Sequence, residues 1–185
     1  IKISIKNLLA KEKHQFKKIQ LNNFKINFDL KNFKEYKNIF LKKNNLIPIT
    51  FTKGQIIFSD GKDYVATING VNLNLKYVKD SIEAILKGKF LDDNLYINFN
   101  SKKADNKTTK DIILKMSRLN FLIKTNLTNS EKDKSITNGN ILIKKNKNRI
   151  TALFDYKDNQ LTINKSNLRN TFSDGKLEGK IKIFP

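Results

Sequence analysis

Strict alternation of apolar and polar residues is the feature that most restricts what this chain can fold into. The stretch INGVNLNLKYVKD, residues 68–80, places Val71, Leu73, Leu75 and Tyr77 on one side of an extended strand and mostly asparagine and lysine on the other. A period of two is that of a β-strand with one apolar and one solvated face. What the apolar face is for is therefore the question that decides function.

The same alternation recurs along the chain. Asp-, Asn- and Gly-containing turn sequences stand between the strands, at residues 59–61, 92–94, 138–139, 158–159 and 173–175. Closely spaced strands joined by such short turns predict an antiparallel meander. Further strands are predicted at residues 1–5, 19–30, 54–58, 81–90, 94–99, 118–127, 140–145, 149–156, 160–164 and 176–184.

Two stretches depart from this alternation and predict short helices that cover part of the sheet, at residues 32–43 and 108–119. In the second, Thr108 and Asp111 resemble a capping box. The predicted fold is mainly β: a curved antiparallel sheet, open as a groove or folded like a taco, with two short helices. The residues at helical spacing are Phe33, Tyr36, Ile39 and Phe40 in the first stretch and Ile112, Ile113, Met116 and Leu119 in the second.

Three short motifs occur twice in the same order. Residues 54–58, 68–73 and 86–90 correspond to residues 139–143, 163–168 and 177–181. We therefore expect residues 1–185 to be a single β-rich segment of a longer protein, with repeat units at about 49–100 and 136–185. Gly88 and Gly179 interrupt predicted strands, which indicates either bends of a curved sheet or the ends of strands.

The chain is strongly basic, with 37 Lys and Arg against 17 Asp and Glu and a formal net charge of +20. Arginine is confined to Arg118, Arg149 and Arg169, and an excess of lysine and asparagine is what AT-rich codon usage gives any protein. The other interpretation is a real attraction to anionic surfaces, either lipid headgroups or nucleic acid. Because the lysines are scattered rather than clustered with stacking aromatics, nucleic acid is not the expected partner.

Residues for catalysis or metal binding are scarce. Cysteine is absent, which fits a reducing cytoplasm and a periplasm without disulfides equally well. His14 is the one histidine, and it lies in a polar stretch without a nucleophile or an orienting group to work with. Asp60 with Asp63, and Asp92 with Asp93, have the spacing of hairpin turns rather than of a calcium loop. We expect no enzymatic activity, no catalytic residue, no metal and no cofactor.

With these strands laid out, the chain resembles the AsmA-like family of Gram-negative envelope proteins. FKKIQLNNFKINFDL is similar to that family's habit of following one alternating strand directly with another. ITFTKGQIIFSDGKDYVATINGVNLNLKY resembles its recurring unit: an apolar strand that begins with glycine (54–58), a turn containing aspartate, and an alternating strand (68–77). SIEAILKGKF supplies the next strand, and residues 101–134 match less closely.

The resemblance implies a fold and a function. Family members are anchored in the inner membrane by an N-terminal helix, lie mostly in the periplasm and form a long curved β-groove with an apolar interior. They are implicated in phospholipid movement to the outer membrane. The implied partners are phospholipid, the inner membrane through an anchor outside this chain, and other envelope proteins.

On this resemblance, the apolar face would line a groove for acyl chains, with lysine at its rim for the headgroup phosphate. Two alternatives stay open: a basic β-domain that binds nucleic acid or another polyanion, and a scaffold segment whose sheet edge pairs with a neighbour. An alternating strand also fits one half of an ordinary closed core. The residues expected to contact lipid are Leu73, Leu75, Tyr77, Ile82, Ala84, Leu86, Ile97, Phe99, Phe121 and Ile123.

Overall fold

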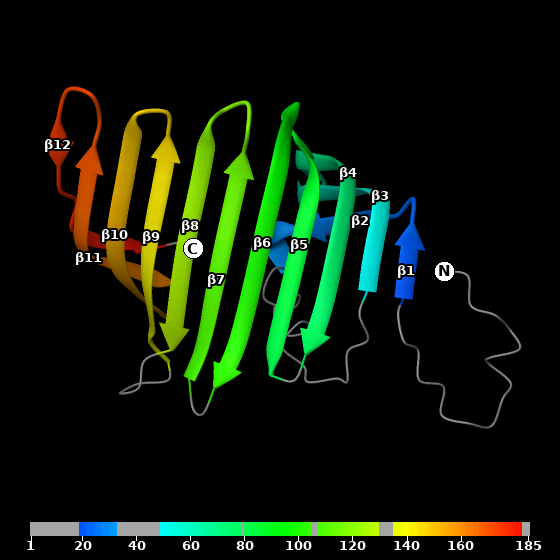
Figure 1. Cartoon of the computed structure of the whole chain (residues 1–185), viewed down its shortest axis with the longest axis horizontal. Coiled ribbons are helices and arrows are strands. Elements are labelled where there is room, and N and C mark those ends of the chain that lie inside the picture. The colour runs from blue at the N-terminus through cyan, green and yellow to red at the C-terminus, as the bar shows by residue number, and fades with distance from the viewer. Residues whose placement is uncertain (1–18, 33–48, 79, 105–106, 130–134, 183–185) are drawn as a thin grey trace, which may run out of the picture.

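The computed structural model describes residues 19–32, 49–78, 80–104, 107–129 and 135–182. In these ranges thirteen strands form one open sheet, so the described part of the chain is mainly β, as predicted (Figure 1). The strands are β1 Ile19–Asn22, β2 Lys25–Asp29, β3 Ile49–Asp60, β4 Asp63–Val78, β5 Ser81–Phe90, β6 Asp93–Ala104, β7 Lys107–Met116, β8 Phe121–Asn129, β9 Thr137–Lys145, β10 Asn148–Lys157, β11 Gln160–Arg169, β12 Asp174–Gly175 and β13 Gly179–Lys182.

The sheet is mixed rather than purely antiparallel. From β3 to β12 each strand pairs antiparallel with the next one along the chain, which confirms the predicted meander. The prediction is wrong at one edge, because β1 and β2 both pair in parallel with β3. Parallel neighbours need a connection that returns the chain to the same end of the sheet. Residues 30–48 separate β2 from β3, and the short 3-10 turn η1 (Leu30–Asn32) begins this stretch.

The predicted helix at residues 108–119 is also wrong, because this segment forms strand β7. Its apolar residues fit both periods, and pairing with β6 on one side and β8 on the other selects the strand. The other predicted helix, residues 32–43, falls outside the described residues apart from Asn32. Since the described ranges contain no α-helix, no helix there has the length and apolarity to cross a membrane.

Short turns join the hairpins. The predicted turn at 158–159 coincides with one of them, and the predicted turns at 59–61 and 92–94 overlap the observed turns at 61–62 and 91–92 by one residue each. The predicted turn at 138–139 is wrong, because both residues lie inside β9, and residues 173–175 overlap β12. Among the described residues, seven of the nine non-glycine positions with positive φ are Asn or Asp, the side chains that enter this region most easily. The two exceptions are Lys53 and Leu91.

Strands β3 and β4 bend where their pairing shifts register. The shifts fall at Gly54 in β3 and between Asn69 and Asn72 in β4, where Gly70 has a φ of 57°. Bulges of this kind bend a strand sharply. Beyond the bend, β2 and the adjoining halves of β3 and β4 turn behind β5 and β6 (Figure 1).

The main core lies at this folded corner of the sheet. Gly88 of β5 faces it, and a β-carbon there would lie 2.8 Å from Ile68 Cγ2 and 3.0 Å from the carbonyl oxygen of Asn69. The glycine therefore lies inside β5 rather than at its end, and it permits a close approach of β4 at the bend. The buried members of the core are Ile56, Ile68, Val71, Leu95 and Met116.

A second, smaller fold of the sheet involves β10 and β11, whose pairing shifts register between Leu153 and Phe154. The ring of Phe154 is 7% exposed and covers Gly139, its partner on β9. Strand β12 pairs with the second half of β11 and β13 with its first half, and β13 runs crosswise behind β10 in Figure 1.

One sheet runs through all the described residues, so we treat them as one structural unit. The repeat at about 49–100 and 136–185 stays a prediction. Its matched stretches 54–58 and 68–73 lie on the adjacent strands β3 and β4, whereas 139–143 and 163–168 lie on β9 and β11 with β10 between them.

Candidate functional site

All ten residues predicted to contact lipid lie on one face of the sheet, which we call the apolar face. Residues directly opposite each other on paired strands share a face. Leu75 lies opposite Ala84, which lies opposite Phe99, and Tyr77 lies opposite Ile82. Phe121 lies opposite Met116, which lies opposite Leu95, so Phe121 is on the same face. The remaining four, Leu73, Leu86, Ile97 and Ile123, lie in a single row described next.

The most continuous feature of the apolar face is a row of apolar side chains, in register across ten strands, β1 and β3 to β11. We call it the apolar row. At about 4.8 Å between strands, its nine steps span roughly 43 Å. Each member lies directly opposite the next: Leu21, Phe51, Leu73, Leu86, Ile97, Leu114, Ile123, Ile143, Ile150 and Leu168.

A second row runs beside the apolar row and contains two polar residues, Thr125 and Ser166. The Ser166 hydroxyl is held by the backbone of Leu177, donating to its carbonyl oxygen and accepting from its N–H, both at 2.5 Å. The row therefore offers few polar groups to a ligand. Its members are Ile19, Ile49, Leu75, Ala84, Phe99, Ile112, Thr125, Ile141, Ala152 and Ser166.

Every member of the apolar row is partly exposed, and none is fully buried. In a closed sandwich, by contrast, the inward-facing residues of both sheets form a packed core. Of the ten predicted residues, Leu73, Leu86, Ile97 and Phe121 pack against the buried core at the folded corner. The other six lie outside that cluster, and they are the stronger candidates for contact with a ligand.

Tyr77 is partly buried on the apolar face. Burial raises the pKa of its phenol above the ordinary value of 10.0. Removal from water disfavours the charged form of an ionisable group, so the phenol of Tyr77 is held in its neutral form to higher pH.

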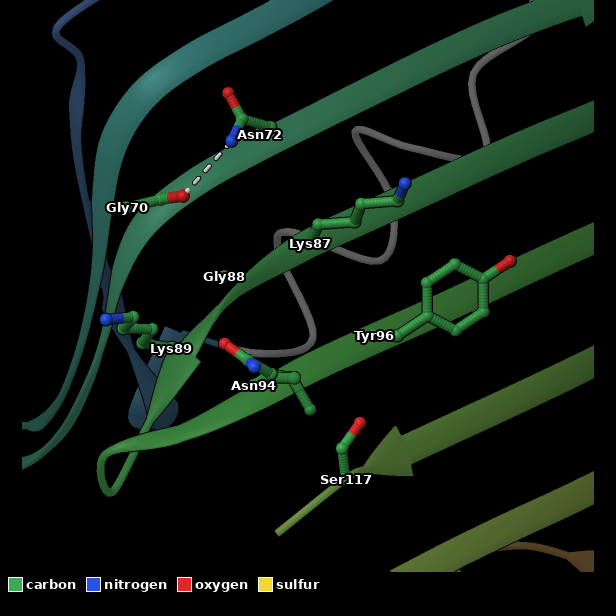
Figure 2. A pocket seen from close by; sticks show the side chains of 9 residues that line it. Gly70, Asn72, Lys87, Gly88, Lys89, Asn94, Tyr96 and Ser117 are labelled. Carbon is green, nitrogen blue, oxygen red and sulfur yellow. Dashed lines mark hydrogen bonds between the residues drawn. The ribbon is translucent and has the colours of Figure 1, made fainter.

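The opposite, polar face carries Asn72, Asn74 and Lys76, as the alternation predicts. Two hollows lie mainly on this side, of about 440 and 320 Å³. The larger adjoins the bend in β4, where the Asn72 amide donates to the carbonyl oxygen of Gly70 at 3.3 Å, and Lys87 and Tyr96 stand beside it (Figure 2). None of the ten predicted residues lines either hollow.

Two of the four carboxylates considered as calcium ligands, Asp60 and Asp93, have structural partners. Asp60 flanks a hairpin turn and lies 3.6 Å from the ammonium of Lys31. Asp93 is buried and accepts hydrogen bonds from the backbone N–H groups of Arg118 and Leu119. In the described ranges no three His, Cys, Asp or Glu side chains come together to hold a metal ion, and His14 lies outside those ranges.

Strand β7 contributes to both rows, which the sequence pattern does not predict. Ile112 and Leu114 fill the two rows between β6 and β8, and they are not among the ten predicted residues because the spacing in this segment predicts a helix. The β-branched residues Thr108, Thr109, Ile112 and Ile113 are the signal that favours a strand there. Ile143 and Ile150 extend the apolar row in the same way.

No protein-family model matches this sequence, and searches of curated proteins and of solved structures find no match either. The AsmA-like resemblance therefore stays a prediction, and the residues and their geometry carry the functional conclusion.

Proposed function

We propose that this chain is a periplasmic segment of an inner-membrane-anchored, AsmA-like protein, and that its apolar face holds phospholipid acyl chains during their transport to the outer membrane. The observation that carries the proposal is the apolar row: ten partly exposed apolar side chains in register across ten strands. Soluble proteins rarely leave contiguous apolar patches larger than a few hundred Å² exposed. An acyl chain lying on the row would remove it from water, at about 0.8 kcal/mol for each CH₂ group buried.

The folded corner supports a groove-like shape for this face. Ile56 and Ile68, beyond the bend, pack against Leu95 and Met116 on the apolar side of β6 and β7. The sheet thus folds over its own apolar side at one end. All members of the apolar row nevertheless keep part of their surface exposed. This arrangement fits a groove that is closed at one end by its own core.

The chemistry of the face fits transport rather than selection of one lipid. Thr125 and Ser166 are the polar members of the two rows, and Ser166 is already occupied by the backbone of Leu177. A surface of this kind gains free energy from buried hydrocarbon in proportion to its area, without regard to the headgroup. We therefore propose that the face accepts phospholipids of different headgroups.

Ile112 and Ile113 provide a matched pair for the test. They are neighbours in β7 and both are partly exposed, yet Ile112 lies opposite Phe99 on the apolar face and Ile113 lies opposite Asn98 on the polar face. The chain is expressed in a Gram-negative host, and native mass spectrometry measures the phospholipid that co-purifies with the wild type, with Ile112→Asn and with Ile113→Asn.

We expect the wild type and Ile113→Asn to carry phospholipid and Ile112→Asn to lose most of it. The thermal midpoint of each variant shows whether both have lost similar stability. A second apolar-face variant, Leu75→Asn, should behave as Ile112→Asn does. A wild type without lipid, or equal loss of lipid in the two isoleucine variants at equal stability, would refute the proposal.

A further inference from the structure

Four turns lie along one edge of the sheet, because alternate turns of an antiparallel meander return to the same end (Figure 1). They follow β5, β7, β9 and β11, at residues 91–92, 117–120, 146–147 and 170–173. We call this the turn edge. Three of the turns present a large apolar side chain to solvent: Leu91 is 71% exposed, Leu119 40% and Phe172 95%.

The backbone at Leu91 is strained for a leucine. Its φ is 48°, and that of Asp92 is 59°. Two-residue hairpin turns of this kind favour asparagine, aspartate or glycine, because a bulky side chain at positive φ crowds the following carbonyl. A leucine here costs backbone strain and exposes apolar surface to water. Folding alone gives no reason for it.

Hydrogen bonds hold two of the other tips in place. Asp93, only 1% exposed, accepts from the N–H groups of Arg118 at 2.8 Å and Leu119 at 2.9 Å. The side-chain oxygen of Asn170 accepts from the N–H groups of Phe172 at 2.7 Å and Ser173 at 2.8 Å. The apolar tips are therefore presented by ordered turns, which reduces the entropy lost when they bind a partner.

Cations stand directly behind the tips on the polar face. The strand register places Lys87, Lys115, Lys144 and Arg149 in one row across β5 to β10, and all four are exposed. Lys147 adds a fifth in the β9–β10 turn itself. None of these five forms an ion pair with the residues that the structure describes.

Little acid offsets these cations at the turn edge. Asp174 is bound by the guanidinium of Arg169, with contacts of 3.0 and 3.2 Å, which leaves Asp92 as the exposed carboxylate beside the tips. Glu83 lies at the opposite end of the strands and is paired with Lys76 at 3.5 Å. The turn edge is therefore both apolar at its tips and net positive behind them.

We propose that the turn edge docks onto the surface of an anionic lipid bilayer. Leu91, Leu119 and Phe172 enter the boundary between headgroups and acyl chains, and the row of cations faces the phosphates. Exposed apolar side chains next to basic residues are the combination by which protein segments bind membrane interfaces. A nucleic acid would use the cations but gain much less from the exposed leucines, so the observations favour the bilayer.

The hollow in Figure 2 gives this docking a place for a headgroup. Lys87 and Lys89 line it together with Asn94 and Ser117, close behind the first two turns of the edge. This inference goes beyond the proposed transport function, because docking at the turn edge does not require lipid on the apolar face.

Sedimentation of the full chain with vesicles tests the proposal. Phosphatidylcholine vesicles with and without phosphatidylglycerol are compared, and circular dichroism confirms that each variant is folded. The tip variant combines Leu91→Asn, Leu119→Asn and Phe172→Asn. The cation variant combines Lys115→Gln, Lys144→Gln and Lys147→Gln. The control variant combines Tyr64→Asn, Val78→Asn and Leu153→Asn, which are exposed apolar residues outside the four turns.

We expect the wild type to bind vesicles that contain phosphatidylglycerol. The tip and cation variants should bind more weakly, by about fivefold for each side chain replaced. The control variant should bind as the wild type does. Absence of wild-type binding, or equal weakening by the control and tip variants, would overturn the proposal. The proposal would also be overturned if the wild type bound a single-stranded oligonucleotide more tightly than the vesicles and the tip variant bound the oligonucleotide equally well. The cations would then bind a polyanion rather than a bilayer.

A single tryptophan reports insertion directly, because the chain contains none. Phe172→Trp should shift its fluorescence to the blue when vesicles containing phosphatidylglycerol are added, and Tyr64→Trp should not. If the tryptophan at position 172 stays in water while the protein binds the vesicles, the turn edge is not the docking surface.

Discussion

Replacement of Gly139 by alanine tests the packing of the Phe154 ring on Gly139, where β9 and β10 pair. A β-carbon at Gly139 would overlap the ring of Phe154 and would lie 2.8 Å from Cδ2 of Leu127. Because Phe154 is 7% exposed, the ring has little room to move away. Overpacking of this kind costs about 1–3 kcal/mol. The lower backbone entropy of alanine in the unfolded chain offsets about 0.4–1 kcal/mol of that cost.

The expected net loss is about 1–2 kcal/mol, or roughly 2–8 °C in the thermal midpoint of a protein of this size. Thermal unfolding followed by far-UV circular dichroism measures it. Gly175→Ala is the control, because no heavy atom lies within 4 Å of a β-carbon there. If Gly139→Ala is no more destabilising than Gly175→Ala, the ring does not rest on the glycine. Gly139→Ala should cost less stability when it is made in the Phe154→Leu variant than when it is made in the wild type, because the smaller side chain leaves room for the alanine methyl group.

Three further predictions concern single side chains. Burial raises the pKa of Tyr77 in the folded protein. The stability that its neutral phenol contributes is therefore complete below pH 10.0 and is lost as the pH rises through the folded-state pKa. Tyr77→Phe should reduce the loss of unfolding free energy at alkaline pH, measured by urea unfolding. Burial alone would raise the pKa of Asp93, but backbone N–H groups, among them those of Arg118 and Leu119, lower it below 3.8 overall. Stability from its ionised form is thus present above pH 3.8 and lost below it, and Asp93→Asn should lower the thermal midpoint at pH 7 more than at pH 3. Leu91→Asn should raise the free energy of unfolding by about 1 kcal/mol through relief of strain, and a decrease would contradict the strain.

The alternation of apolar and polar residues predicted most strands and the common face of all ten candidate residues, because a period of two is read directly from the chain. It failed at β7. There Ile112, Ile113 and Met116 recur at helical spacing while Ile112, Leu114 and Met116 alternate as in a strand, and only the neighbouring strands select between the two. The turn predicted at Asn138–Gly139 failed for a related reason. There the glycine makes room for the ring of Phe154 across the strands, a contact that no local pattern contains.

The parallel edge and the continuity of the apolar row were beyond the reach of the sequence. Alternation shows which residues of a strand share a face, but it does not show which strand is its neighbour or in which direction that neighbour runs. The pairing of β1 and β2 with β3 depends on the connection through residues 30–48, whose length is compatible with either direction. The turn edge was missed because exposure at a turn tip depends on the folded turn, not on composition.

The same turns that align the apolar row also form the turn edge, and this joins the two proposals. A slip of one residue in any pair would move a whole strand's apolar side chains to the polar face, so tight turns are what keep the row continuous. Leu114 lies three residues before Ser117, and Ile123 lies three residues after Asn120, so at β7 and β8 the row runs about 10 Å from the turn edge at 3.3 Å per residue. That distance is shorter than one lipid leaflet, which is roughly 20 Å thick. A bilayer docked at the turn edge would therefore lie within one lipid's length of the surface that we propose carries the acyl chains.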